Sequence, residues 1–162
     1  MTERINISSP IFDKKAILEG LQEVLETGQV SQGPVVKEVE EMMTQKFESK
    51  YASAFSNGTS SLRAALVASA VTASNIDKKY IDREMKGREV VIPAFSFNAT
   101  LNTVIQTGAT ARVVDVAESD FMLHDENVER VLNLNTIAIM PVDLYGQAST
   151  VSPVLCRFGY CS

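Results

Sequence analysis

The stretch EVVIPAFSFNATLNTVIQTGATARVV, residues 89–114, decides the fold class of this chain. It begins with a short apolar run, residues 89–92, that stops at a proline and is typical of a buried strand. Residues 98–107 predict a helix that ends at Gly108. Residues 111–116 predict another strand. A strand, a helix and a strand in this order favour a βαβ unit with parallel strands.

The alternation of strand and helix continues on both sides of this unit. Downstream, the pattern predicts an amphipathic helix at residues 125–132 and a strand at residues 136–140. Upstream, it predicts a strand at residues 51–55, a turn at 56–61 and a helix of small residues at 62–73. The fold class that follows is α/β, a mostly parallel sheet with flanking helices.

The N-terminal segment predicts two helices and no strand. Residues 13–27 place apolar side chains on one helical face, with Asp13 as the predicted N-cap and Gly28 as the residue that ends the helix. Pro34 suits the first turn of a second helix that runs to about Lys50. The two predicted helices form an N-terminal arm.

The composition excludes several classes of protein. Hydrophobic residues make up 45% and charged residues 22% of the 162 residues, and the formal net charge is −5. An acidic surface argues against nucleic acid as the partner, because binding to a phosphate backbone requires a basic face. The longest uncharged run, from Val90 to Ala111, contains Pro93 and several polar residues, so we expect no membrane span. Charges occur throughout residues 1–30, so we expect no signal peptide.

The scarcity of cysteine and histidine limits metal chemistry. Cys156 and Cys161 are the two cysteines, and His124 is the single histidine. This set excludes a Cys/His zinc site. The absence of cysteine from the rest of the chain is consistent with a reducing compartment, and we expect a cytoplasmic protein. His124 itself is either a catalytic base or, as we favour, a residue of a surface turn.

Three segments directly follow predicted strands, and ligands of parallel sheets bind beyond such strand ends. They are residues 56–61, 93–100 and 141–147. In the first, Gly58 and its neighbours Thr59 and Ser60 precede a predicted helix, whose free backbone N–H groups suit a phosphate. The alternative is an ordinary N-cap, because Ser and Thr often cap helices.

The second and third segments also allow two interpretations. Phe97 and its neighbour Phe95 offer a flat face to a planar ring, or they are core residues. Asp143 and Tyr145 face a ligand pocket, or they belong to a plain turn in which Gly146 supplies a positive φ.

Taken together, SQGPVVKEVEEMMTQKF, SNGTSSLRAAL, VVIPAFSFNAT and TIAIMPVDLYGQ come in an order that resembles one family. It is that of the pyridoxal-phosphate (PLP)-dependent sugar aminotransferases of the DegT/DnrJ/StrS type. The resemblance runs from about Ile5 to Leu155. It implies the N-terminal part of a fold-type-I PLP-dependent transferase large domain at residues 51–155. A helical arm, residues 1–50, precedes this part, and a tail, residues 156–162, that does not resemble the family follows it.

The resemblance implies a function as well as a fold. The family transfers an amino group, typically from glutamate, to a keto group of a nucleotide-linked sugar for polysaccharide biosynthesis. Members are similar in forming homodimers with PLP as the cofactor. Here, Gly58, Thr59 and Ser60 would contact the cofactor phosphate, and Phe97 would stack on the pyridine ring.

Further positions follow from the same resemblance. Ser31 and Gly33 belong to a turn near the dimer-built active site. Asp143 and Tyr145 lie in the vicinity of the cofactor or the substrate. The family often has His where this chain has Asp143, so any contact made by that His does not carry over.

Two departures from the family pattern leave an alternative open. The charged segment at residues 74–87, a predicted solvated loop or short helix, is longer than the usual link. The family's Asp that faces the pyridine nitrogen, and its lysine that binds the cofactor covalently, have no counterpart in this chain. The alternative is therefore a catalytically inactive truncated fragment that keeps a remnant of the phosphate or cofactor site. A generic phosphate-binding α/β module is disfavoured by the FSFNAT and VDLYG segments.

Overall fold

The computed structural model describes residues 9–74 and 85–149. The chain forms two compact units, Met1–Ala54 and Phe55–Ser162, and each is described by itself. Most of the charged segment at 74–87 and the whole tail at 156–162, with both cysteines, lie outside the described residues.

The first unit contains the two helices predicted for the N-terminal arm. Helix α1 (Lys14–Thr27) is capped by Asp13, whose Oδ1 accepts hydrogen bonds from two backbone N–H groups, each at 3.1 Å. It ends at Gly28, whose φ of 70° is the left-handed conformation that glycine adopts without strain. Helix α2 (Pro34–Lys46) begins with proline and ends earlier than predicted. Neither helix contains a buried residue, so their apolar faces are exposed within this unit.

The strand predicted at residues 51–55 is wrong. The described chain has no regular structure there, and Tyr51 is 77% exposed. The backbone N–H of Ala54 donates to Glu40 Oε1 at 2.8 Å instead of to a neighbouring strand. An apolar run becomes a strand only where another strand completes its hydrogen bonds, and no described strand lies beside this one.

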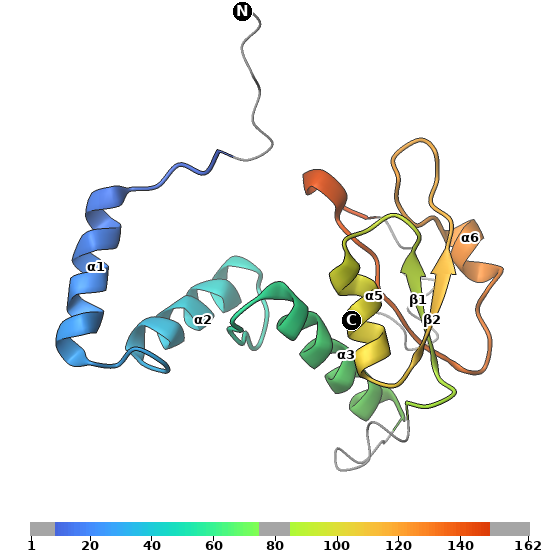
Figure 1. Cartoon of the computed structure of the whole chain (residues 1–162), viewed down its shortest axis with the longest axis horizontal. Coiled ribbons are helices and arrows are strands. Elements are labelled where there is room, and N and C mark those ends of the chain that lie inside the picture. Colours follow the sequence, from blue (N-terminus) through green and yellow to red (C-terminus); the bar gives the residue numbers. More distant parts are fainter. Residues whose placement is uncertain (1–8, 75–84, 150–162) are drawn as a thin grey trace, which may run out of the picture. The chain divides into compact units, whose positions relative to one another are not determined.

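The second unit is built on a parallel sheet of three strands in the order β2-β1-β3, as Figure 1 shows in part. Strand β1 pairs in parallel with both neighbours, so Val90 lies between Ala111 of β2 and Ala138 of β3. This arrangement confirms the α/β class with a parallel sheet. The elements of the unit are α3 (Gly58–Ser74), β1 (Glu89–Pro93), α5 (Asn98–Gln106), β2 (Thr110–Val114), α6 (Asp125–Glu129), β3 (Thr136–Ile139) and the 3-10 turn η2 (Leu144–Gly146).

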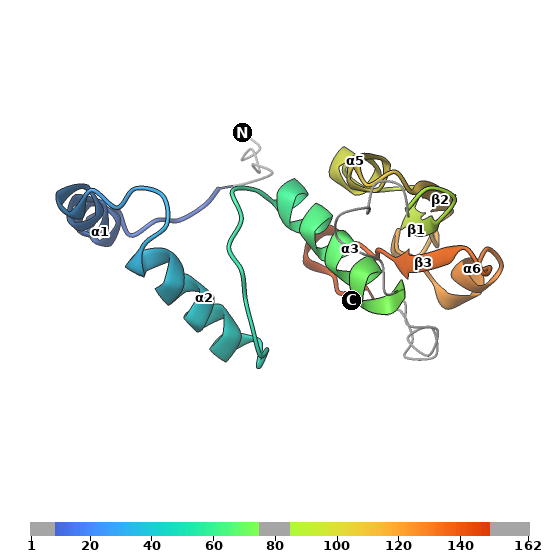
Figure 2. The same cartoon turned by 90° about the horizontal axis from the view of Figure 1, so that it is seen from below.

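Helices cover both faces of the sheet. Helices α3 and α5 contact each other and lie on one side, whereas α6 lies on the other (Figure 2). Side chains of β1 alternate accordingly, since successive residues of a strand point to opposite faces. Val90 and Ile92 pack into the cluster that includes residues of α3 and α5, and Val91 packs into the cluster that includes Val128 of α6.

Two helix boundaries differ from the prediction. Helix α3 begins at Gly58 rather than Leu62, because Asn57 caps it and residues 58–61 form its first turn. Helix α6 is shorter than predicted and ends at Glu129. The first shift matters for function, since it places a proposed phosphate site inside the helix rather than before it.

Candidate functional site

The ends of β1 and β3 open into a crevice of about 360 Å³. Because these two parallel strands are neighbours, the segments that follow them leave the same edge of the sheet. In Figure 1, both η2 and the start of α5 lie beyond the point of the β1 arrow. The lining residues, which we call the strand-end crevice, are Phe95, Ser96, Phe97, Val142, Asp143, Leu144 and Tyr145.

One wall of the strand-end crevice is aromatic. Phe97 directly precedes α5 and is 81% exposed, so the alternative that it is a core residue is wrong. Phe95 is half-exposed, and its ring lies against that of Phe121 with the centroids 5.6 Å apart. The Phe95 ring is therefore held by its contact with Phe121. The exposed Phe97 ring is open to a ligand.

The segment after β3 adds a carboxylate and a phenol to the lining of the crevice. The Oδ1 atom of Asp143 accepts a hydrogen bond from the backbone N–H of Ser149 at 2.8 Å, which fixes the carboxylate. Tyr145 is 89% exposed and has a φ of 52°, a left-handed conformation that is strained for a non-glycine residue. Gly146 has a φ of 83°, as its predicted role in a turn requires. The two interpretations of this segment therefore apply together, because the turn that contains Gly146 also supplies the crevice-lining residues Asp143 and Tyr145.

The start of α3 combines a cap with unused backbone donors. The Oδ1 atom of Asn57 accepts a hydrogen bond from the backbone N–H of Ser60 at 2.9 Å. A side chain therefore caps the helix, as the N-cap alternative expects, but the capping residue is Asn57 rather than Ser or Thr, and the Ser60 amide already has a partner. No described residue accepts a hydrogen bond from the backbone N–H of Gly58 or Thr59. These two amides are the donors that a phosphate would use.

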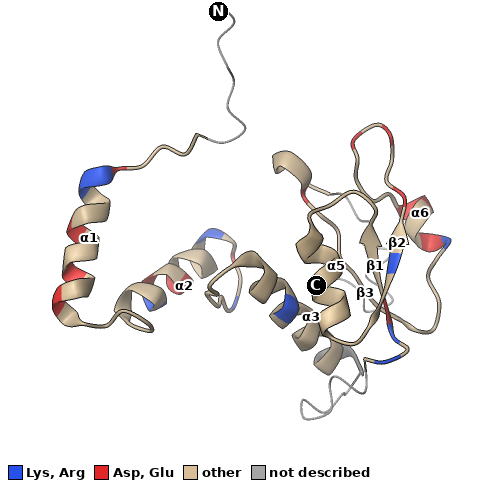
Figure 3. Ribbon diagram, in the orientation of Figure 1, with Lys and Arg blue, Asp and Glu red and all other residues tan. Residues whose placement is uncertain are grey.

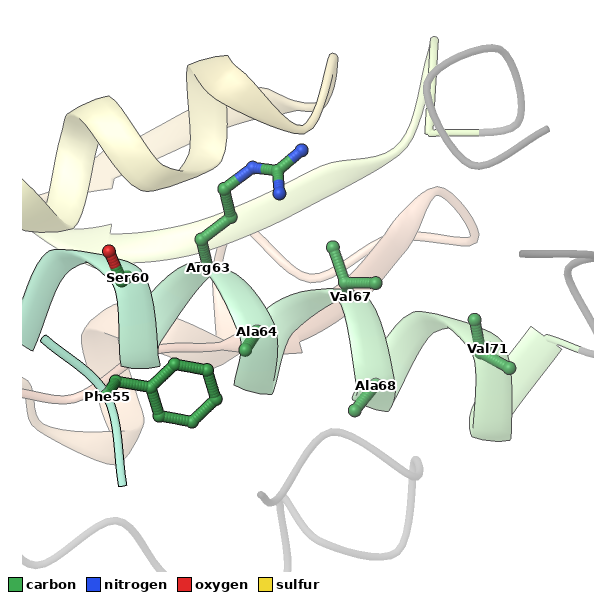
Figure 4. A pocket seen from close by; sticks show the side chains of 7 residues that line it. All are labelled: Phe55, Ser60, Arg63, Ala64, Val67, Ala68 and Val71. Atoms are coloured by element: carbon green, nitrogen blue, oxygen red, sulfur yellow. The ribbon is translucent and has the colours of Figure 1, made fainter. Parts of the chain in front are cut away.

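A wide groove of about 730 Å³ runs along α3 (Figure 4). The Phe55 ring lies beside the helix, and Arg63 is the one charged side chain in the lining. Ser60 lines this groove and is absent from the strand-end crevice, so the structure does not bring Ser60 and Phe97 into one pocket. The first turns of α3 and α5 and the turn η2 nevertheless lie at the same end of the unit in Figures 1 and 2.

Ser31 and Gly33 lie in the connection between α1 and α2. Both line a cavity of about 200 Å³ within the first unit, together with Val30 and Pro34. Their contribution to an active site stays a prediction.

His124 lies outside the strand-end crevice. It precedes α6 and its Nε2 atom is 2.9 Å from Asp120 Oδ2. The hydrogen bond to His124, with a second one from the backbone N–H of Met122, lowers the pKa of the Asp120 carboxyl. The pair joins the two ends of an exposed turn, which agrees with the surface-turn interpretation of His124.

Residues 12–156 of the chain match the DegT/DnrJ/EryC1/StrS aminotransferase family. The chain belongs to this family. The match covers the arm helices, the parallel sheet and the strand-end crevice.

Relatives within the aminotransferase family include two characterised bacterial enzymes. The chain is 30% identical over 85% of its length to 3-oxo-glucose-6-phosphate:glutamate aminotransferase of Bacillus subtilis, of which it covers 28%. It is 31% identical over 90% of its length to UDP-2-acetamido-2-deoxy-3-oxo-D-glucuronate aminotransferase of Pseudomonas aeruginosa, of which it covers 38%. The chain thus spans about a third of the length of these relatives.

A solved structure supports the same fold. An aminotransferase from Psychrobacter cryohalolentis is 28% identical with a TM-score of 0.70, over 86% of this chain and 32% of that one. The chain therefore has the fold of part of a fold-type-I PLP aminotransferase. Among the described residues, no helix is both long and apolar enough to cross a membrane.

The described residues fit the cofactor of the aminotransferase family in part. The unused amides of Gly58 and Thr59 fit its phosphate, and the open ring of Phe97 fits its pyridine ring. No lysine among the described residues of this unit lies at this end of the sheet. Within the described part of the second unit the one lysine is Lys86, which precedes β1 and lies at the amino end of the strands.

Three groups around these sites were not predicted from the sequence. They are Ser96 in the crevice, the Ser149 amide that binds Asp143, and Arg63 in the α3 groove. A signal existed for Arg63 alone, because it is the single charged residue between Gly58 and Ser74.

Proposed function

We propose that this chain forms the N-terminal part of a PLP-dependent aminotransferase that acts on nucleotide-linked keto sugars, with glutamate as the amino donor. The observation that carries the proposal is the strand-end crevice, whose lining combines an exposed Phe97 ring with Asp143 and Tyr145 in a member of this family. The names of the relatives support separate parts of it: one includes glutamate together with an oxo sugar phosphate, and the other includes a UDP-linked oxo sugar. A place in polysaccharide biosynthesis, a cytoplasmic location and a homodimer belong to the same proposal.

Each predicted site residue has a part in holding the cofactor or the substrate. The backbone N–H groups of Gly58 and Thr59 hold the phosphate, helped by the positive end of the α3 dipole. Ser60 contributes its hydroxyl, since its amide is occupied by Asn57. Phe97 stacks on the pyridine ring and orients it. When bound, PLP supplies an electron sink for carbanion chemistry at the amino-bearing carbon.

The remaining predicted residues act around that ring. Asp143 and Tyr145 line the same crevice as Phe97 and bind the substrate or the edge of the cofactor. Ser31 and Gly33 contribute from the arm to an active site that two subunits build.

A second candidate function is favoured by the distribution of lysine. Since Lys86 lies at the amino end of the strands, no described lysine of the second unit reaches the carboxyl end. By itself, this chain is then a binding module that holds the cofactor without transferring amino groups. The two candidates differ in catalysis and agree on the binding site.

Calorimetric titration of the chain with PLP tests the binding site shared by both candidates. We expect one site per chain and a loss of about fivefold to tenfold in affinity for Phe97→Ala, the usual worth of an aromatic contact. Phe12→Ala, which removes an exposed ring of the first unit, is the matched control and leaves affinity unchanged. Equal affinity of the Phe97→Ala variant and the wild type would contradict the site.

A second measurement separates the two candidates. A full-length protein that contains this sequence is incubated with glutamate and a UDP-linked keto sugar, and the amino sugar is detected by mass spectrometry. Formation of the amino sugar by that protein, but not by the 162-residue chain, supports the aminotransferase function of the full-length protein and the binding-module function of the chain by itself. Formation by the chain itself would show that the binding-module function is wrong.

A further inference from the structure

The carboxylate of Asp143 is oriented by a hydrogen bond but forms no ion pair with a described residue. Its Oδ1 atom accepts the hydrogen bond from the Ser149 backbone N–H, and no described residue pairs with its Oδ2 atom. None of the ion pairs among the described residues includes Asp143. One oxygen of an oriented carboxylate is therefore left to accept a hydrogen bond from a ligand.

Asp143 is the one charged side chain among the seven described residues that line the strand-end crevice. Helix α5, which begins beside Phe97, has no charged residue, and its ribbon is tan in Figure 3. The carboxylate of Asp143 is therefore the one formal charge that the described lining presents to a ligand.

The other lining groups suit the apolar face of a ring. The exposed Phe97 ring, half-exposed Phe95 and the side chains of Val142 and Leu144 line the crevice together with the carboxylate. A crevice of this kind, mostly apolar with one well-placed acceptor, recognises a ligand by its shape and by the group that meets the acceptor.

We infer that Asp143 restricts the sugar ring of the substrate to one without an anionic substituent. The carboxylate accepts a hydrogen bond from a hydroxyl of a neutral sugar and repels a sugar that carries a carboxylate or a phosphate. This inference rests on the proposed function, because it concerns the sugar of a nucleotide-linked substrate. It makes Asp143 a specificity-determining residue.

The expected size of the effect follows from Coulomb's law. Two like charges about 6 Å apart repel each other enough to change affinity roughly threefold in water and about a hundredfold at the effective dielectric of a protein surface. An open crevice lies between these limits, so we expect a preference of about tenfold for the neutral sugar.

Two nucleotide sugars that differ by one carboxylate test the inference. The 162-residue chain, Asp143→Asn and Glu118→Gln are titrated with UDP-glucose and with UDP-glucuronate, and binding is followed by the amide resonances of Leu144 and Gly146. Glu118→Gln is the matched control, because it removes the same net charge from an exposed residue outside the crevice.

The expected result is that the wild type and Glu118→Gln bind UDP-glucose about tenfold more tightly than UDP-glucuronate. The ratio falls to about twofold or less in Asp143→Asn. A wild type that binds both sugars equally, or a ratio unchanged in Asp143→Asn, overturns the inference and leaves the proposed function standing. If the wild type binds neither nucleotide sugar, the inference is wrong, because it requires the sugar to bind in this crevice, whereas the proposed function is decided by the formation of the amino sugar in the full-length protein.

Discussion

Asn57 and Ser60 are joined by a hydrogen bond of 2.9 Å, from the Ser60 backbone N–H to Asn57 Oδ1, that starts helix α3. The Ser60 amide in the first turn is therefore used to cap the helix. The amides of Gly58 and Thr59 in the same turn have no described acceptor. Capping and anion binding therefore use different amides of the same turn. This separation allows stability and ligand binding to be tested independently.

The first prediction concerns the cap itself. Asn57→Ala removes the acceptor for the Ser60 N–H and is expected to lower the free energy of unfolding by about 1 kcal/mol, the usual worth of an N-cap. Asn57→Asp keeps an acceptor at this position and serves as the control with unchanged stability. Urea unfolding followed by circular dichroism measures both. A loss in Asn57→Asp as large as that in Asn57→Ala would contradict the capping role.

The second prediction separates the amides of the same turn. Thr59→Pro removes an N–H that has no described acceptor, whereas Ser60→Pro removes the N–H bonded to Asn57. Proline is tolerated in the first turn of a helix, so Thr59→Pro weakens PLP binding about tenfold or more with little loss of stability. Ser60→Pro lowers the melting temperature further. Calorimetry measures PLP binding by the two variants, and thermal melts measure their stability. If the two variants lose binding and stability equally, the Thr59 and Ser60 amides do not have separate roles.

The sequence predicted the strands of the sheet well and the start of α3 poorly, for physical reasons. Each of the three predicted strands that formed contains mostly apolar residues, and two of them stop at a proline, a signal that needs no knowledge of distant residues. The run at 51–55 has the same local signal but no described strand beside it. Pairing is a tertiary property, so a local pattern does not predict it.

The candidate site was predictable to a similar extent. The rule that ligands bind beyond strand ends brought Phe97 and Asp143 to one crevice, because β1 and β3 are neighbours. The Ser149 amide that fixes Asp143 was not predictable, since it depends on the path of the chain after η2. The role of Asn57 as the cap also escaped, because SNGTSS contains several residues that cap helices equally well.

The third prediction uses the pair of Asp120 and His124. Hydrogen bonds lower the pKa of the Asp120 carboxyl in the folded chain, so its ionised form stabilises the fold. That contribution is present above the unfolded-state pKa of about 3.9 and is lost as the pH falls through the lower folded-state value. Between about pH 5 and pH 3, the melting temperature of the wild type therefore falls more steeply than that of Asp120→Asn.

Glu118→Gln is the control for this pH dependence, because Glu118 is an exposed carboxylate of the same loop. Its melting temperature is expected to follow the wild type over the acidic range. If the wild type and Asp120→Asn differ by the same amount at pH 7 and pH 3, the ionisation of Asp120 does not contribute to stability.

The last prediction concerns covalent attachment of the cofactor. An aldehyde cofactor reacts with whichever lysine amines it reaches, and a stable link requires a lysine held at the binding site. Lys86, the one described lysine of the second unit, lies at the opposite end of the strands from the crevice. Borohydride reduction of the chain mixed with PLP should therefore label several exposed lysines partially, as peptide mass spectrometry would reveal. Phe97→Ala should leave this labelling pattern unchanged even though it weakens reversible binding, because no lysine is among the described residues that line the crevice. Stoichiometric labelling of a single lysine that disappears in Phe97→Ala would show that the chain carries its own covalent site.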